Sequence, residues 1–114
     1  MLTIYLNKTI KTEEFIALIN TAIENESIIT WKKDSDGDYT ASSSQWSMQA
    51  WMHPYVEDNI IKFGIISRRN VKLSSIVYAI YHSRFSEMLL IHFDKYIKKI
   101  EISSLLVKGI DIFD

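Results

Sequence analysis

The sequence is poor in the residues that build covalent, metal and phosphate sites: its 114 residues include no cysteine, one proline and three glycines. Without cysteine, the chain can form no disulfide framework, no thiolate nucleophile and no Cys-ligated zinc or iron–sulfur site. The glycines are isolated at Gly37, Gly64 and Gly109, whereas phosphate-binding loops and dinucleotide fingerprints require clustered glycines. We therefore expect neither type of nucleotide-binding loop and no cofactor.

Membrane and nucleic-acid partners are also disfavoured. No apolar run reaches the roughly 18 residues of a membrane span, and residues 1–7 lack the charged start and long apolar stretch of a signal peptide. The net charge of -1 does not provide the overall basic field of a dedicated nucleic-acid-binding protein. The length suits one packed core. We expect one cytoplasmic domain over residues 1–114, with no membrane partner and no direct nucleic-acid binding.

Hydrophobic periodicity predicts a strand, a short helix over Glu13–Glu24, several consecutive strands, a long helix and a final strand. The pair Asp36-Gly37 marks a tight hairpin turn, and Pro54 is expected to stop strand pairing. The segment Tyr39–His53 forms either one long bent strand or two short ones. The other expected strands are Leu2–Leu6, Ile28–Trp31, Ile60–Ser67 and Ile100–Val107, followed by a tail over Gly109–Asp114.

The long helix is predicted over Ser74–Lys98, which contains no glycine or proline. At about 100° per residue, one face carries mainly apolar and aromatic side chains, including Phe85 and His92. Ile80 and Ile91 lie towards the opposite side, so we expect a sheet and the first helix, or a second copy of the chain, to cover much of this helix. The order of elements indicates an α+β fold: a mostly antiparallel sheet of about four to six strands, packed by a short N-terminal helix and a long C-terminal helix.

The histidines give little support for catalysis. His53, His82 and His92 do not pair at the i, i+4 spacing of a metal-binding helix, and we expect no metal site. An acid–base group with an anion-binding guanidinium could form from Tyr81, Arg84 and His92, in a pocket between the sheet and the long helix. For His92 we favour the structural interpretation, a core histidine hydrogen-bonded to a neighbour. We expect no catalytic set.

Charge is unevenly distributed along the chain: residues 1–61 carry a net -5, residues 62–108 a net +6 and the remaining tail -2. In a four-strand meander, the turns at Asp36-Gly37 and Glu57-Asp58 would lie at the same end of the sheet and form one acidic edge. If Tyr39–His53 is one long strand, the turns lie at opposite ends and this edge disappears. The alternative interpretation is that these acids are ordinary solvated turn residues. Parity places Trp51 on the outer face, where it either packs under a loop or anchors an interface. The candidate protein-binding residues are Asp34, Asp36, Asp38, Trp51, Glu57 and Asp58.

The stretch Val77–Asp94 is the most distinctive part of the chain and carries no catalytic signature. In size, composition and general character the chain resembles the small cytoplasmic immunity and inhibitor proteins of bacteria, a similarity of type that assigns no residue a role. We prefer a non-enzymatic protein-binding module that neutralises a toxin or effector by direct binding. The alternatives are a small enzyme or ligand-binding domain that uses Tyr81, Arg84 and His92, and a structural homodimer joined through the long helix.

Overall fold

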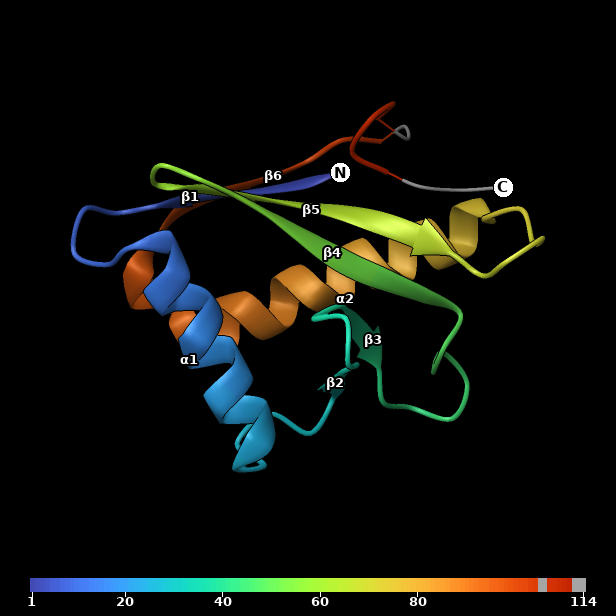
Figure 1. Ribbon diagram of the computed structural model, residues 1–114, viewed down its shortest axis with the longest axis horizontal. Coiled ribbons are helices and arrows are strands. Elements are labelled where there is room, and N and C mark those ends of the chain that lie inside the picture. The colour runs from blue at the N-terminus through green and yellow to red at the C-terminus, as the bar shows by residue number, and fades with distance from the viewer. Residues whose placement is uncertain (105–106, 112–114) are drawn as a thin grey trace.

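The computed structural model describes residues 1–104 and 107–111, which form one six-stranded antiparallel sheet and two helices (Figure 1). The sheet order is β2-β3-β4-β5-β1-β6. This arrangement confirms the predicted α+β class. The elements are β1 (Leu2–Leu6), α1 (Thr12–Glu24), β2 (Trp31–Lys33), β3 (Tyr39–Ala41), β4 (Ala50–Glu57), β5 (Ile60–Ser67), α2 (Ser75–Phe93), a short 3₁₀ helix η1 (Asp94–Tyr96) and β6 (Ile97–Ile102).

The segment Tyr39–His53 contains two strands, which settles the choice that the sequence left open. β3 ends at Ala41, and turns lead to β4. The prediction that Pro54 stops strand pairing is wrong, because β4 continues through it and Pro54 lies opposite Phe63 of β5. β3 extends along β4 only as far as Met52, so Pro54 lies beyond it on an edge, where proline is tolerated.

Both helices lie on the same side of the sheet (Figure 1), and the main core lies between the helices and the sheet. Phe85 of α2 is at the centre of an aromatic cluster: its ring centroid lies 4.8 Å from that of Trp31, 5.7 Å from Tyr39 and 4.8 Å from Phe63. These side chains come from β2, β3 and β5, and each is nearly or fully buried. A single helical side chain therefore contacts three strands. None of the described helices is both long and apolar enough to cross a membrane.

The boundaries of β2, the last helix and the last strand differ from the prediction. β2 begins at Trp31, where the predicted strand Ile28–Trp31 ends, because residues 31–33 are the ones that pair with β3. Ser74 caps α2, because its Oγ accepts a hydrogen bond from the N–H of Val77 at 3.1 Å. The helix ends at Phe93 rather than at Lys98. β6 begins at Ile97, where it pairs with Leu6 of β1, so the pairing with β1 draws the residues after Tyr96 into the sheet. The predicted strand Ile100–Val107 is thus shifted towards the N-terminus, and residues 105–106 lie outside the described part of the chain.

The described part of the predicted tail packs against the sheet. β1 begins at Leu2, opposite Phe63, and past that point along β5 the carboxylate of Asp111 accepts a hydrogen bond from the N–H of Ile65 at 2.9 Å. Beside it, the carbonyl of Ile110 passes directly over Gly64, where a Cβ atom would lie only 1.9 Å from the carbonyl oxygen. Only glycine leaves room for this close approach. Residues 107–111 therefore cover the edge of β5 that β1 leaves open.

We expect Phe85→Ala and Leu89→Ala each to lower the free energy of unfolding by about 2 to 5 kcal/mol, because both side chains are fully buried and their removal leaves cavities in the core. Leu90→Ala is the matched control, since Leu90 is 48% exposed and its truncation should cost less than about 1 kcal/mol. Denaturant unfolding of the three variants, at a protein concentration low enough for the chain to be monomeric, measures these differences. Similar losses for Leu89→Ala and Leu90→Ala would contradict the assignment of the buried face.

Candidate functional site

The turn between β2 and β3 gathers three carboxylates from Asp34, Asp36 and Asp38, whose oxygens lie within 4.8 Å of one another. Asp34 shapes the turn, because its Oδ1 accepts the N–H groups of Asp36 and Asp38, both at 2.9 Å. Gly37 takes the positive φ of +83° that the predicted Asp-Gly turn requires. Asp38 is buried, and its Oδ1 lies 2.5 Å from Nδ1 of His53. Asp36 is exposed and is the carboxylate best placed to meet a partner.

Three aromatic rings form a row beside this turn, on the side of β4 that faces away from the helices. Trp51, His53 and Tyr55 alternate with the buried Ala50 and Met52 and are themselves half-buried. His53 joins the row to Asp38, and the rings of His53 and Tyr55 meet edge to face at 4.9 Å. We define the acidic–aromatic face as Asp34, Asp36, Asp38, Trp51, His53 and Tyr55.

Glu57 and Asp58 lie outside this face. The four consecutive strands β2 to β5 form a meander, so both acidic turns lie at the same end of the sheet. However, β4 continues from His53 to Glu57, four residues or about 13 Å further along the strand. Glu57 also forms an ion pair with Lys62 at 2.9 Å. The structure therefore brings the three aspartates together, places Trp51 two residues along β4 from the His53 that contacts Asp38, and leaves Glu57 and Asp58 at a distance.

The three aspartates are the one group of acidic or histidine side chains, among the described residues, whose ligand atoms lie close enough to share a cation. Asp34 already accepts two backbone N–H groups, and Asp38 faces His53. A calcium loop of the EF-hand type would need a bidentate glutamate at its twelfth position, where this chain has Gln45. We assign no metal to this group.

Tyr81 and Arg84 lie together at a cavity of about 460 Å³ between α2 and the region around β2 and β3. The hydroxyl of Tyr81 serves the fold, because it hydrogen-bonds to Thr40 Oγ1 at 3.0 Å and donates to the carbonyl of Trp46. Arg84 is exposed. The described residues that line this cavity therefore include two of the three that the pocket hypothesis requires.

The third residue of that pocket, His92, is exposed, and the prediction that it lies on the apolar face is wrong. The next residue, Phe93, is buried instead and packs edge to face on Phe15 of α1 at 5.5 Å. The position of α1 decides this outcome, because α1 covers the side of the last helical turn that carries Phe93. His92 does not line the cavity of Tyr81 and Arg84 as the structure describes it.

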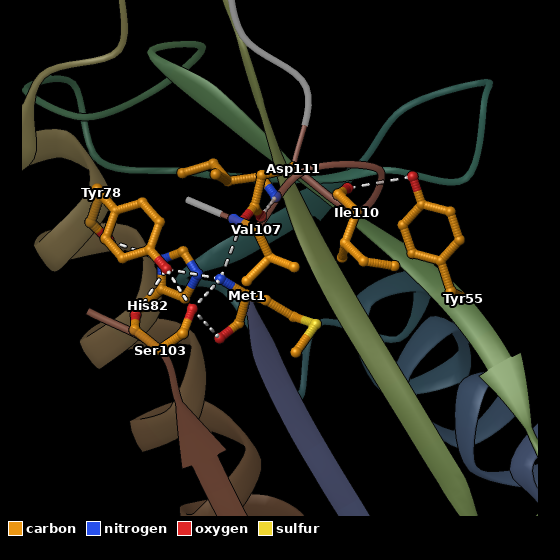
Figure 2. Close-up of polar contacts among 9 residues, drawn as sticks. Met1, Tyr55, Tyr78, His82, Ser103, Val107, Ile110 and Asp111 are labelled. Carbon is orange, nitrogen blue, oxygen red and sulfur yellow. Dashed lines mark hydrogen bonds and ion pairs between the residues drawn. The ribbon is translucent and has the colours of Figure 1, made fainter. Parts of the chain in front are cut away.

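The buried histidine of α2 is His82, which is 1% exposed (Figure 2). Its ring stacks on Tyr78 at 3.9 Å, and Nδ1 donates a hydrogen bond to the carbonyl of Tyr78 at 2.8 Å. Nε2 is buried and has no hydrogen-bond partner among the described residues. Burial lowers the pKa of His82 to about 4, so the ring is neutral at physiological pH. The sequence signal for this residue was its position on the face of Tyr78 and Phe85, four residues after one and three before the other.

A polar cluster next to His82 ties the two ends of the described chain to α2 (Figure 2). The ammonium group of Met1 donates to the hydroxyl of Tyr78 at 2.6 Å and to Oγ of Ser103 at 2.9 Å, and it pairs with Asp111 at 3.2 Å. His82, Tyr78 and Ser103 also line a cavity of about 530 Å³ with mainly apolar walls. The contacts of this cluster hold β1, α2 and residues 107–111 together.

No family model matches the chain, and neither the curated proteins nor the solved structures that were searched include a similar protein. The functional argument therefore depends on the geometry of this chain alone.

We expect the free energy of unfolding to fall as the pH is lowered from about 6.5 to about 4. The folded protein keeps the pKa of His82 at about 4, against an ordinary value of about 6.5, so in this range only the unfolded chain takes up the proton. The stabilising contribution is complete above pH 6.5, is lost as the pH falls to 4, and amounts to at most about 3 kcal/mol. The ammonium of Met1 and the carboxylate of Asp111 also act on His82, in opposite directions.

Denaturant midpoints of the wild type, His82→Gln and His92→Gln between pH 4 and 7 measure this dependence. His82→Gln should flatten the pH dependence, whereas the exposed His92→Gln should leave it unchanged. The same pH dependence in the wild type and in His82→Gln would refute the assignment.

Proposed function

We propose that the chain is a non-enzymatic protein-binding module of the immunity or inhibitor type, which neutralises a toxin or effector by covering its functional surface. The observation that carries the proposal is the acidic–aromatic face, where His53 contacts Asp38 of the acidic turn and the half-buried Trp51 follows two residues away on the same side of β4, with the exposed carboxylate of Asp36 at the tip of the turn. Aromatic residues surrounded by charge are typical of binding surfaces that associate rapidly and hold tightly.

The two parts of the face have different roles in this proposal. Asp36, together with Asp34 in the same turn, attracts a basic partner over distances of about the Debye length and raises the association rate. Residues 1–61, which contain the whole face, carry a net charge of -5. Trp51 supplies the area that is desolvated in the complex, next to Ile66 on β5. The expected partner is therefore a protein with a basic rim around an apolar pocket.

The experiment is affinity capture from the native host with two baits, the wild-type chain and Trp51→Ala, followed by binding kinetics with the proteins that only the wild type retains. We expect Trp51→Ala to raise the dissociation rate and to cost about 2 kcal/mol or more. Asp36→Asn should lower the association rate and its dependence on salt. Unfolding midpoints of both variants show whether they remain folded.

Asp58→Asn is the matched control, because it removes the same charge from an exposed residue at the other turn. It should have a smaller effect on the association rate than Asp36→Asn. A partner whose binding is insensitive to Trp51→Ala and Asp36→Asn would rule out this face as the binding site.

The second candidate is a ligand-binding domain that uses the cavity of Tyr81 and Arg84. Trp31, Trp46 and Tyr81 line this cavity, and the described residues give Arg84 no ion pair. Because Glu87 lines the same cavity, such a site suits a zwitterionic ligand with an aromatic or apolar body, whose anionic group binds Arg84. A small molecule of this class that raises the unfolding temperature of the wild type but not of Arg84→Gln would favour this candidate.

A further inference from the structure

The side of α2 that faces away from the sheet carries exposed apolar side chains. Ile76, Leu90 and Ile91 are 64%, 48% and 67% exposed, and Ile80 on the same side is half-buried. The buried residues of the helix, such as Phe85, lie on the opposite side, against the sheet. A helix at the surface of a globular protein normally presents polar side chains to solvent. In the described part of the chain, α2 thus has two apolar faces: one is buried against the sheet, and the other is exposed to solvent.

This apolar surface extends beyond the helix. Ile29, which is 73% exposed, borders the cavity that Ile80, Arg84 and Glu87 also line. Several exposed apolar side chains around charged groups on one side of a helix are typical of an interaction site. We define the exposed α2 surface as Ile29, Ile76, Ile80, Arg84, Glu87, Leu90 and Ile91.

Two charged residues lie in the middle of this surface. Arg84 and Glu87 are both exposed, and neither forms an ion pair with another described residue. The midpoint between them along the helix lies between residues 85 and 86. Ile80 and Ile91 have the same midpoint. The charged pair and the apolar pair are therefore arranged symmetrically about one point of α2.

We infer that α2 forms the interface of an antiparallel, two-fold symmetric homodimer. A two-fold axis through the shared midpoint sets Arg84 opposite Glu87 of the second copy and Ile80 opposite Ile91 of the second copy. Symmetry repeats both contacts, as in any isologous interface. A second copy is thus complementary to this surface in both charge and apolar character.

The charges also select the direction of the two helices. In a parallel two-fold pair, each Arg84 would face Arg84 and each Glu87 would face Glu87 of the other copy. Juxtaposed like charges are unfavourable, so they disfavour this arrangement. The antiparallel pair replaces two repulsions by two attractions.

This inference goes beyond the proposed function and uses another part of the molecule. The exposed α2 surface lies on the helical side of the sheet, whereas Trp51 lies on the side that faces away from the helices. Different substitutions therefore test the two proposals, and either one can fail without the other.

Sedimentation velocity of the full chain over a wide range of concentrations tests the inference. We expect a concentration-dependent dimer, and we expect Ile91→Asp to weaken it by at least about tenfold, because the interface would bury the new charge. Arg84→Glu alone and Glu87→Arg alone should each weaken the dimer, because each places like charges opposite one another. The double variant Arg84→Glu/Glu87→Arg should restore the dimer to within about threefold of the wild type.

Arg68→Glu is the control, since it makes the same charge change at an exposed residue outside the surface, and it should leave the dimer intact. Unfolding midpoints confirm that each variant is folded; if Ile91→Asp is not, the charge exchange decides. A chain that remains monomeric at every concentration overturns the inference. A dimer that folded Ile91→Asp or the single charge variants leave unchanged, or that the double variant does not restore, also overturns it.

Discussion

The fold depends on the contact of Phe85 with three strands. Its ring meets Trp31, Tyr39 and Phe63 from β2, β3 and β5, at edge-to-face or tilted angles that are favourable for aromatic pairs. Because these strands lie at different places in the sheet, the contact fixes both the position of α2 and its rotation about its own axis. The same rotation turns His82 towards Met1 at the start of β1 and turns Ile91 outwards.

A two-layer arrangement with both helices on one side leaves the molecule with two unlike surfaces. The far side of the sheet is partly covered by residues 107–111, which approach it closely at Gly64. The acidic–aromatic face lies directly beside them, because the hydroxyl of Tyr55 donates a hydrogen bond to the carbonyl of Ile110. The helical side presents apolar side chains around two charges of opposite sign. The core separates these surfaces, so a partner on one side does not block access to the other. Surfaces of such different chemistry favour different kinds of partner.

Local patterns were sufficient where local interactions determine the structure. The alternation of apolar residues predicted the bounds of β1 and β5, and helical spacing predicted α1 to within one residue at its start. The errors lie where a distant segment decides. β6 begins early because Leu6 of β1 pairs with Ile97, and no pattern in residues 94–99 encodes that partner.

The candidate site was predictable to a similar extent. The Asp-Gly signal located the acidic turn, and parity placed Trp51 on the outer face. The sequence did not reveal that Asp38 is buried against His53, because this contact joins two strands. Nor did it distinguish His82 from His92, which lie at about equal angles on either side of the centre of the buried face. The packing of Phe93 on Phe15 of α1 determines that His82 is buried and His92 is exposed.

The contact of residues 110 and 111 with β5 can form only late, because the chain is synthesised from its N-terminus and β5 is made first. The hairpin of β4 and β5 is synthesised 46 residues before the carboxylate that accepts the N–H of Ile65. While the chain is still growing, β5 has an open edge at Gly64 and Ile65, and such an edge can pair with other chains. Residues 107–111 therefore protect this edge from such pairing only after they have themselves been synthesised.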